Sequence, residues 1–411
     1  MYWSIKLFIR SFRQRPRIVA SNVSCKFYFI STKPFCNLGI FGRSVGRMEK
    51  IKKPLVSFGV LTDVQYADCE DRPASYDPSA TRFYRGSLAH VNEAFKFWKS
   101  SELKVKFVLQ LGDIIDGLNV SLKGSHSALQ RTLTHFEKQS IPTFHTVGNH
   151  ELYNFNRREL AELFYESIKK ISIPPEVFCP IKPLRDESNA SNPILYYKFS
   201  PTPRVKCISL DCFDVSVLGY PHSHSNYQEA AKILTAKHKH DIFNDWDCDG
   251  SLEGLESRFQ QMNGALSEKQ LKWLGTELTE SDELGQKVIV FGHVSLSPDS
   301  TDWNCILWNY ESVINTFHQH KCVIAYLSGH SHKSGYAIDS HHISYVVFNG
   351  IVETPPDTTS FATVSIFEDC LEIHGHGLEQ SYNIPFMTNI STEEIVETDI
   401  ETSPSTVKVE V

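Results

Sequence analysis

The nine residues LQLGDIIDG, at positions 109–117, contain the end of an apolar run that spans residues 106–111. The run is short, rich in Val, Leu and Phe, and closed by a glycine, which is typical of a buried β-strand. A carboxylate just past such a strand emerges at the strand's carboxyl end, where ligands bind in sheets layered with helices. Asp113 is therefore the first candidate for a functional residue.

Four further motifs of the same kind end apolar runs at 55–61, 142–147, 287–291 and 322–327. They are Asp63-Val64-Gln65, Gly148-Asn149-His150-Glu151, Gly292-His293 and Gly329-His330-Ser331-His332. Helical periodicity lies between the runs, at 83–98, 128–139, 157–171, 268–278 and 310–318. This alternation predicts an α/β protein with a largely parallel sheet layered with helices. All five motifs would then meet at the carboxyl ends of the strands.

The side chains of these motifs are carboxylates, amides and imidazoles, which are the ligands that hard and borderline divalent cations prefer. Taken singly, each motif has an ordinary structural explanation: Asp63 as a strand-end turn residue, His293 as a buried histidine. Five motifs in this order, each at the end of an apolar run, are not explained in that way. We assign no metal site to the other histidine-rich stretches, at 222–224, 238–240 and 318–320, which we expect on solvated surfaces.

Composition excludes several classes of function. The chain has 411 residues, of which 41% are hydrophobic, and carries a formal net charge of −7. Residues 1–47 hold nine Lys and Arg and no acid, so the rest of the chain carries about −16. An acidic body argues against a nucleic-acid partner. No apolar stretch reaches the roughly 18 residues of a membrane span, so we expect no membrane partner. Ten cysteines without a CxxC pair indicate thiols in a reducing compartment.

We expect three regions along the chain. Residues 1–47 form a basic extension outside the fold: either a mitochondrial transit peptide or sequence upstream of a cytosolic start at Met48. The protein would thus be cytoplasmic, or mitochondrial through 1–47. Residues 55–387 form the main domain, with cap insertions at about 173–203 and 216–263. Residues 388–411 form an acidic, disordered tail.

The five motifs resemble those of the calcineurin-like metallophosphoesterase superfamily, over residues from about 55 to 376. The resemblance implies a four-layer αββα sandwich with cap insertions. Within that superfamily, the residues around the motifs are similar to those of the manganese-dependent ADP-ribose/CDP-alcohol diphosphatases. The supporting stretches are residues 58–65, 109–117, 148–155 and 349–356.

The resemblance also implies a site for two divalent metal ions. Asp113 would bridge the two ions. Most superfamily members have His where this chain has Gln65, and an amide oxygen is a harder ligand than imidazole, so Mn²⁺ is favoured over Zn²⁺ or iron. Mn²⁺ is thus the ion expected for activity, with Zn²⁺ or Mg²⁺ as alternative occupants. The remaining ligands would be Asp63, Gln65 and His332 for one ion, and Asn149, His293 and His330 for the other.

The implied reaction is hydrolysis of a pyrophosphate bond by a hydroxide held between the metals. ADP-ribose would give AMP and ribose 5-phosphate; CDP-choline or CDP-glycerol would give CMP and a phosphoalcohol. His150 would stabilise developing charge or protonate the leaving oxygen. Asp116 would orient a neighbouring residue rather than bind metal.

Two positions bear on the substrate. Protein phosphatases of the superfamily carry arginines that grip a terminal phosphoryl group, where this chain has Gly117 and Val147. We therefore expect a nucleoside diphosphate-linked small molecule, handled by a monomer. The residues expected to contact it are Tyr76, Tyr153, Asn154 and Cys305.

Two alternatives stay open on the sequence alone. One is a cyclic-nucleotide or other phosphodiesterase on the same fold. The other is a non-catalytic scaffold that binds proteins, which we expect to have lost ligands that this chain retains.

Overall fold

The computed structural model describes residues 52–170, 193–241, 243 and 252–386. The predicted basic extension at 1–47, the acidic tail at 388–411 and most of the first cap insertion lie outside the described residues. So does most of the acidic loop in the second insertion. Within the described ranges the strands form two six-stranded sheets and a small two-stranded one.

The first sheet has the strand order β14-β13-β12-β1-β4-β5. Strands β1, β4 and β5 are parallel, whereas β12 runs antiparallel to β1 and begins an antiparallel half. The bounds are β1 (Val56–Leu61), β4 (Val105–Gln110), β5 (Thr143–His145), β12 (Ser360–Ile366), β13 (Cys370–Gly377) and β14 (Tyr382–Pro385).

The second sheet has the order β10-β11-β9-β8-β7-β6. Its four central strands are parallel and its two edge strands are antiparallel to their neighbours. The expectation of a largely parallel sheet is therefore correct only for one half of the first sheet, β1, β4 and β5, and for the four central strands of the second. The bounds are β6 (Tyr197–Thr202), β7 (Val205–Ser209), β8 (Lys287–Phe291), β9 (Val323–Ser328), β10 (Gly335–Ile338) and β11 (Ser344–Val347), with β2 (Arg72–Pro73) and β3 (Thr81–Arg82) in the small sheet.

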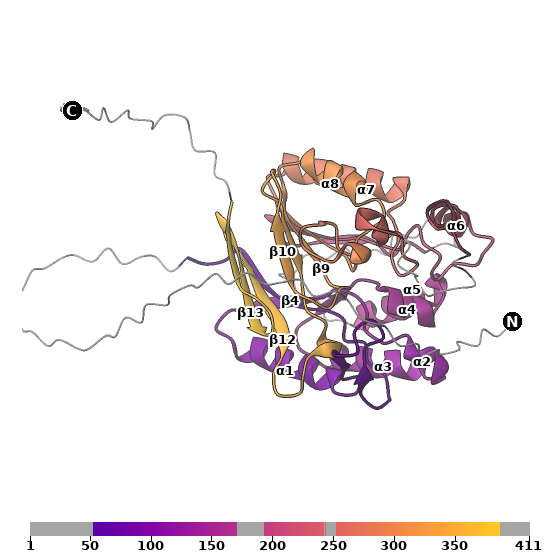
Figure 1. The fold of residues 1–411 in the computed structure, drawn as a ribbon. Coiled ribbons are helices and arrows are strands. Elements are labelled where there is room, and N and C mark those ends of the chain that lie inside the picture. Colours follow the sequence, from indigo (N-terminus) through magenta and orange to yellow (C-terminus); the bar gives the residue numbers. More distant parts are fainter. Residues whose placement is uncertain (1–51, 171–192, 242, 244–251, 387–411) are drawn as a thin grey trace, which may run out of the picture. The chain divides into compact units, whose positions relative to one another are not determined.

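Helices cover the outer face of each sheet. Figure 1 shows α1 and α3 below the first sheet, and α7 and α8 above the second. This order of layers is the predicted αββα sandwich. The helices are α1 (Ser87–Ser100), α2 (Leu118–Ser121), α3 (Ser125–Glu137), α4 (Asn149–Asn154), α5 (Arg157–Lys170), α6 (Ser225–Lys237), α7 (Glu268–Glu283) and α8 (Tyr310–His318), with short 3₁₀ turns η1 (Gly254–Arg258), η2 (Trp303–Cys305) and η3 (Ile351–Glu353).

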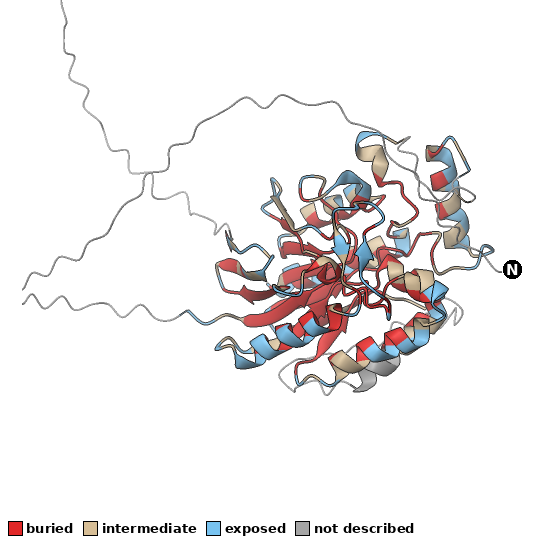
Figure 2. Cartoon of the chain, turned by 60° about the horizontal axis from the view of Figure 1, so that its bottom comes forward, coloured by how far each residue is buried: buried red, intermediate tan, exposed pale blue. Residues whose placement is uncertain are grey.

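The two sheets face each other across an aromatic core. The ring of Phe144 on β5 stacks on that of Phe199 on β6, with centroids 3.9 Å apart, and Phe107 on β4 meets Phe199 edge-on at 5.2 Å. All three are almost fully buried, which contributes about 1.5–3 kcal/mol for each side chain. Figure 2 shows this buried interior, with the exposed residues on the outer sides of the helices.

One predicted boundary needs correction. Residues 197–202, which we assigned to the first cap insertion, form the edge strand β6. Its side chains alternate between buried and half-buried, as in a strand with one covered face. A cap insertion in this region would therefore end before Tyr197. No helix in the described ranges combines the length and the apolar character that a membrane span requires.

Candidate active site

All five motifs lie in one site, because the carboxyl ends of the parallel strands of both sheets meet there. Asp63 and Asp113 follow β1 and β4 of the first sheet, and Asn149 begins α4 after β5. His293 follows β8 of the second sheet, and His330 follows β9. The sequence expectation that these motifs lie together is met in the fold.

The backbone at this site is strained. Positive φ angles, which L-residues other than glycine rarely adopt, occur at seven non-glycine residues in the described ranges. Five of the seven are predicted ligands: Asp63 (φ 50°), Gln65 (41°), Asp113 (57°), His330 (74°) and His332 (61°).

Close backbone approach adds a second constraint, at Gly148. A Cβ atom there would lie 2.0 Å from Asp113 Oδ1, so only glycine allows α4 to begin against this carboxylate. The main-chain N–H of His150 then donates to the same oxygen at 2.9 Å.

One group of donors consists of Asp63, Gln65, Asp113 and His332. Gln65 Nε2 donates to Asp113 Oδ2 at 2.9 Å and lies 2.8 Å from His332 Nε2. His332 Nε2 is 3.2 Å from Asp63 Oδ1. Gln65 Oε1 is buried without a hydrogen-bond partner. If the amide is flipped, Oε1 takes the place of Nε2 beside Asp113 Oδ2 and His332 Nε2. The oxygen then lies among the other candidate metal ligands, where it could bind a cation.

The second group consists of Asn149, His293 and His330, again with Asp113. His293 Nε2 is 3.1 Å from Asn149 Oδ1, 3.1 Å from His330 Nδ1 and 3.3 Å from Asp113 Oδ2. Asp113 Oδ2 therefore faces both groups. A shared carboxylate between two groups of neutral and anionic donors is the arrangement that a two-metal centre needs.

Each imidazole in the two groups has its outward nitrogen occupied by an acceptor. His293 Nδ1 donates to Leu111 O at 2.7 Å. His330 Nε2 lies 2.8 Å from Asn263 Oδ1, and His332 Nδ1 lies 2.7 Å from Glu353 Oε1. Such outer acceptors fix the tautomer and turn the other nitrogen inward as a ligand. The residues present therefore fit two divalent ions.

The electrostatics agree with that fit. Burial lowers the pKa values of His293 and His332, but the charges of Asp113 and Asp63 outweigh it and raise both to about 9. Burial and the neighbouring His293 lower the pKa of His330 to about 3. The pKa values of both carboxyls are lowered, because the imidazole charges outweigh burial. The two carboxylates thus attract positive charge, in the form of protons or of metal ions.

His150 lies at the rim of the two groups. Its side chain is 15% exposed, and its Nε2 is 3.8 Å from Asp113 Oδ2. Its Nδ1 accepts the N–H of Gly117 at 2.8 Å and lies 3.2 Å from Asp116 Oδ2. Burial lowers the pKa of His150, but Asp113 and Asp116 outweigh it, so the pKa is raised. Asp116 thus contacts His150, as expected for an orienting residue.

The predicted substrate residues differ in their surroundings. Tyr76 is 51% exposed, and its hydroxyl donates to Glu353 at 2.7 Å. The hydroxyl of Tyr153 accepts from Asn149 Nδ2 at 3.1 Å. Asn154 donates to Asp116 O and His150 O and accepts from Ser125. Both ends of its amide are thus hydrogen-bonded within the chain.

Cys305 is buried, and burial raises the pKa of its thiol to about 12. A thiol with so high a pKa is inert, which agrees with a wall residue rather than a reactive group.

Sequence reasoning missed four residues around the site. Glu151 is fully buried and accepts main-chain N–H groups of Asp113, Ile114, Ile115 and Gly148, which ties the second and third motifs together. In the structure, the four main-chain N–H groups that donate to this buried carboxylate reveal its linking role. The sequence shows only that a Glu follows His150. The other three are Asn263, Glu353 and Arg82.

Arg82 joins two of the outer carboxylates. Its guanidinium lies 3.3 Å from Asp116 and 3.4 Å from Glu353, and its side chain is only 12% exposed. Glu353 holds His332, and Asp116 holds His150. This partly buried cation therefore links Glu353, the partner of the predicted ligand His332, to Asp116, the partner of the predicted acid His150.

The calcineurin-like phosphoesterase family model matches residues 56–334, which include all five motifs. The chain belongs to this family. It is therefore a hydrolase of the metallophosphoesterase type. Figure 1 places the matched region in both sheets and their helices.

Relatives within the family carry more specific names. A protein of Arabidopsis thaliana named manganese-dependent ADP-ribose/CDP-alcohol diphosphatase is 37% identical over 331 residues, 80% of this chain and 97% of the relative. One of the same name from Bos taurus is 37% identical over 329 residues, 79% of this chain and 92% of the relative. A crystal structure of a dimetal phosphatase from Danio rerio matches with a TM-score of 0.73 at 32% identity, covering 82% of this chain and 100% of that one.

Proposed function

We propose that this phosphoesterase cleaves the pyrophosphate bond of ADP-ribose and of CDP-alcohols such as CDP-choline and CDP-glycerol. The observation that carries the proposal is the pair of donor groups that share Asp113. The names of the relatives, at about the same identity from plants and mammals, support the choice of substrate.

The proposal gives each group of donors one divalent ion, Mn²⁺ in the first place, with Zn²⁺ or Mg²⁺ as alternatives. Bound there, the two ions would supply Lewis-acid activation of phosphoryl oxygens and of a water molecule. Asp113 would contact both. The other protein ligands would be Asp63, Gln65 and His332 on one side, and Asn149, His293 and His330 on the other.

His150 has the partners that a proton donor needs in both of its states. When neutral, its Nδ1 accepts the Gly117 N–H, so the proton lies on Nε2, which faces the donor groups. When doubly protonated, its Nδ1–H can be donated to Asp116 Oδ2, 3.2 Å away. We assign it the role of stabilising charge on the substrate and protonating the leaving phosphate oxygen.

The packing at Gly117 supports a substrate with groups on both sides of the phosphorus. A Cβ at this position would lie 2.9 Å from the ring of Tyr153, so an arginine there would displace that ring. Val147 is buried. The site therefore lacks at both positions the cation that would hold the dianionic end of a monoester.

The test is product release by the full-length protein with Mn²⁺. The panel consists of ADP-ribose, CDP-choline, 2′,3′-cyclic AMP and p-nitrophenyl phosphate. The proposal expects AMP from the first and CMP from the second, with little product from the others. Turnover of only the cyclic nucleotide or only the monoester would agree with a phosphoesterase but would refute ADP-ribose and CDP-alcohols as its substrates. Silence on all four, with metal bound, would favour the non-catalytic scaffold.

A further inference from the structure

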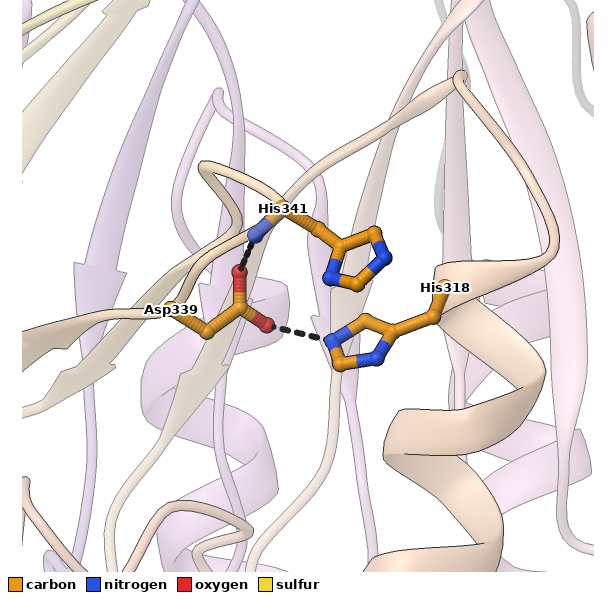
Figure 3. Close-up of side chains that lie close together, drawn as sticks. All are labelled: His318, Asp339 and His341. Atoms are coloured by element: carbon orange, nitrogen blue, oxygen red, sulfur yellow. Dashed lines mark hydrogen bonds and ion pairs between the residues drawn. The ribbon is translucent and has the colours of Figure 1, made fainter.

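Three metal-binding side chains meet away from the candidate active site, where the turn between β10 and β11 lies against the end of α8. His318 is the last residue of α8, and Asp339 and His341 lie on the turn (Figure 3). His318 Nε2 is 2.8 Å from Asp339 Oδ2. One ligand atom from each of the three residues lies within 4.8 Å of the others.

No motif in the sequence marks this cluster, and we expected the stretch 318–320 to be solvated surface. The partners of His318 come from a hairpin that follows it by about 20 residues. The sequence neighbour His320 instead pairs with Asp282, at 2.8 Å.

The carboxylate of Asp339 is held in place by its own turn. Its Oδ1 accepts the main-chain N–H groups of His341 at 2.9 Å and of Ile343 at 3.0 Å. Its Oδ2 accepts the hydroxyl of Tyr345 at 2.8 Å. A carboxylate fixed by three donors is oriented before a ligand arrives, which is the usual arrangement around a metal ligand.

The imidazoles of His318 and His341 are stacked, with centroids 3.6 Å apart and planes 15° apart. Parallel rings cannot both aim a lone pair at one ion, so one of them has to turn. His341 is exposed, whereas His318 and Asp339 are partly buried. His318 and Asp339 are therefore the fixed pair, and rotation of the His341 side chain completes the set.

We propose that His318, Asp339 and His341 bind a divalent transition-metal ion, Zn²⁺ in the first place, at a site separate from the candidate active site. Two imidazoles, one carboxylate and a water molecule make a common four-coordinate zinc site. Mn²⁺ and Mg²⁺ prefer sites richer in oxygen ligands. The proposed site thus differs in metal preference from the other.

The two sites share no residue. His332 precedes β10 and Asp339 follows it, so the four residues of the strand, about 13 Å at 3.3 Å each, lie between them. An ion bound at Asp339 would tie the end of α8 to the β10–β11 turn. Because such an ion binds the folded chain, it raises the temperature of unfolding.

The experiment is equilibrium dialysis of the full-length protein against buffered Zn²⁺, followed by metal analysis. The variant is His341→Ala, which removes one ligand but keeps the main-chain N–H that Asp339 accepts. The matched control is His374→Ala, because His374 is also an exposed histidine beside a carboxylate, 3.2 Å from Glu372 on β13. Zinc at the candidate active site contributes equally to all three proteins.

We expect wild type and His374→Ala to bind one zinc ion per chain more than His341→Ala does. Their unfolding midpoints should also rise with Zn²⁺ by several degrees more than that of His341→Ala, with all three midpoints equal in a chelator. Equal zinc content in wild type and His341→Ala would overturn the proposal, as would an equal loss in His374→Ala. Anomalous diffraction at the zinc edge, with no peak at Asp339 in wild-type crystals, would overturn it as well.

Discussion

Asp113 has a φ of 57°, a conformation that costs about 1–2 kcal/mol for a residue with a Cβ. The surroundings hold it there: its N–H is donated to Glu151, and its carbonyl accepts the N–H of Gln65. Four other predicted ligands share this strain. Since strained residues persist where function requires them, the cluster of outliers supports a functional site independently of the sequence motifs.

Two substitutions separate the proposed roles of Asp113 and His150. Asp113→Ala removes the carboxylate shared by both donor groups, so turnover should be abolished and Mn²⁺ binding weakened. His150→Ala should cut turnover by roughly 10²–10⁴-fold while Mn²⁺ content stays intact. Steady-state kinetics and metal analysis measure both effects. Equal metal loss in the two variants would refute the division of roles.

Arg82 provides a test of the outer network. Arg82→Met leaves Glu353 and Asp116 without the cation between them, so both His332 and His150 lose their orientation. We expect a loss of about 10–100-fold in turnover or in Mn²⁺ affinity. Both kcat and the Mn²⁺ activation constant should be measured.

Arg85→Met is the matched control, because Arg85 is 48% exposed and its ion pairs within the described residues are with the exposed carboxylates of Asp68 and Glu70. Its kinetics should match those of wild type. If Arg82→Met behaves in the same way, Arg82 is a structural residue and not a positioning one.

Among the secondary-structure elements, α4 is tied to the loop after β4 by Glu151. The carboxylate of this α4 residue accepts main-chain N–H groups of Asp113, Ile114 and Ile115. Glu151→Gln replaces one acceptor oxygen by an NH₂ group that faces main-chain N–H donors. Since each unpaired buried donor costs about 1–3 kcal/mol, we expect a destabilisation of about 3 kcal/mol. Urea unfolding measures it, with the exposed Glu70→Gln as a control expected to lie within about 0.5 kcal/mol of wild type. Equal stability of the two variants would contradict the role of Glu151.

Strand β5 carries a pH-dependent contribution to stability through His145. Its ring is buried between Phe136 and Phe164, and burial lowers its pKa to about 3. The unfolded chain binds the proton below about pH 6.5 and the folded chain does not. The contribution to stability is therefore complete above that pH and is lost as the pH falls toward 3.

The variant His145→Gln keeps a partner for Gln110 but does not titrate. We expect the stability difference between wild type and this variant to shift by about 1.4 kcal/mol against wild type from pH 7.5 to 5.5. Urea unfolding of both proteins at the two pH values, in a chelator, measures the shift. A constant difference would mean that the pKa of His145 is the same in the folded protein as in the unfolded chain.

Across the whole molecule, the functional residues that could be predicted from the sequence are those that lie just past strand ends. Asp63, Asp113 and His293 come just after apolar runs that form parallel strands. Because the carboxyl ends of these strands meet, the structure brings the three residues together. Contacts between distant segments were not predictable in this way. Arg82 meets Glu353 across 271 positions, and His318 meets Asp339 through the packing of α8 on the hairpin.

Strand β6 was missed for a local reason. Its sequence, YKFSPT, includes Pro201, and a proline within a short run argues against a strand. The structure accommodates it because β6 lies at the edge of the second sheet, where one side of the strand needs no partner. The hydrogen bonds of Asn154 to Asp116, His150 and Ser125 were likewise not predictable from its position beside the motif.

The proposed function depends above all on Asp113 being shared by two metal ions. Crystals grown with Mn²⁺ and measured at the manganese edge would locate those ions. We expect two anomalous peaks per chain roughly 3.5–4 Å apart, both in contact with Asp113. One peak should lie with Asp63, Gln65 and His332, and the other with Asn149, His293 and His330. A single peak, or two peaks of which one does not contact Asp113, would refute the shared role of this carboxylate.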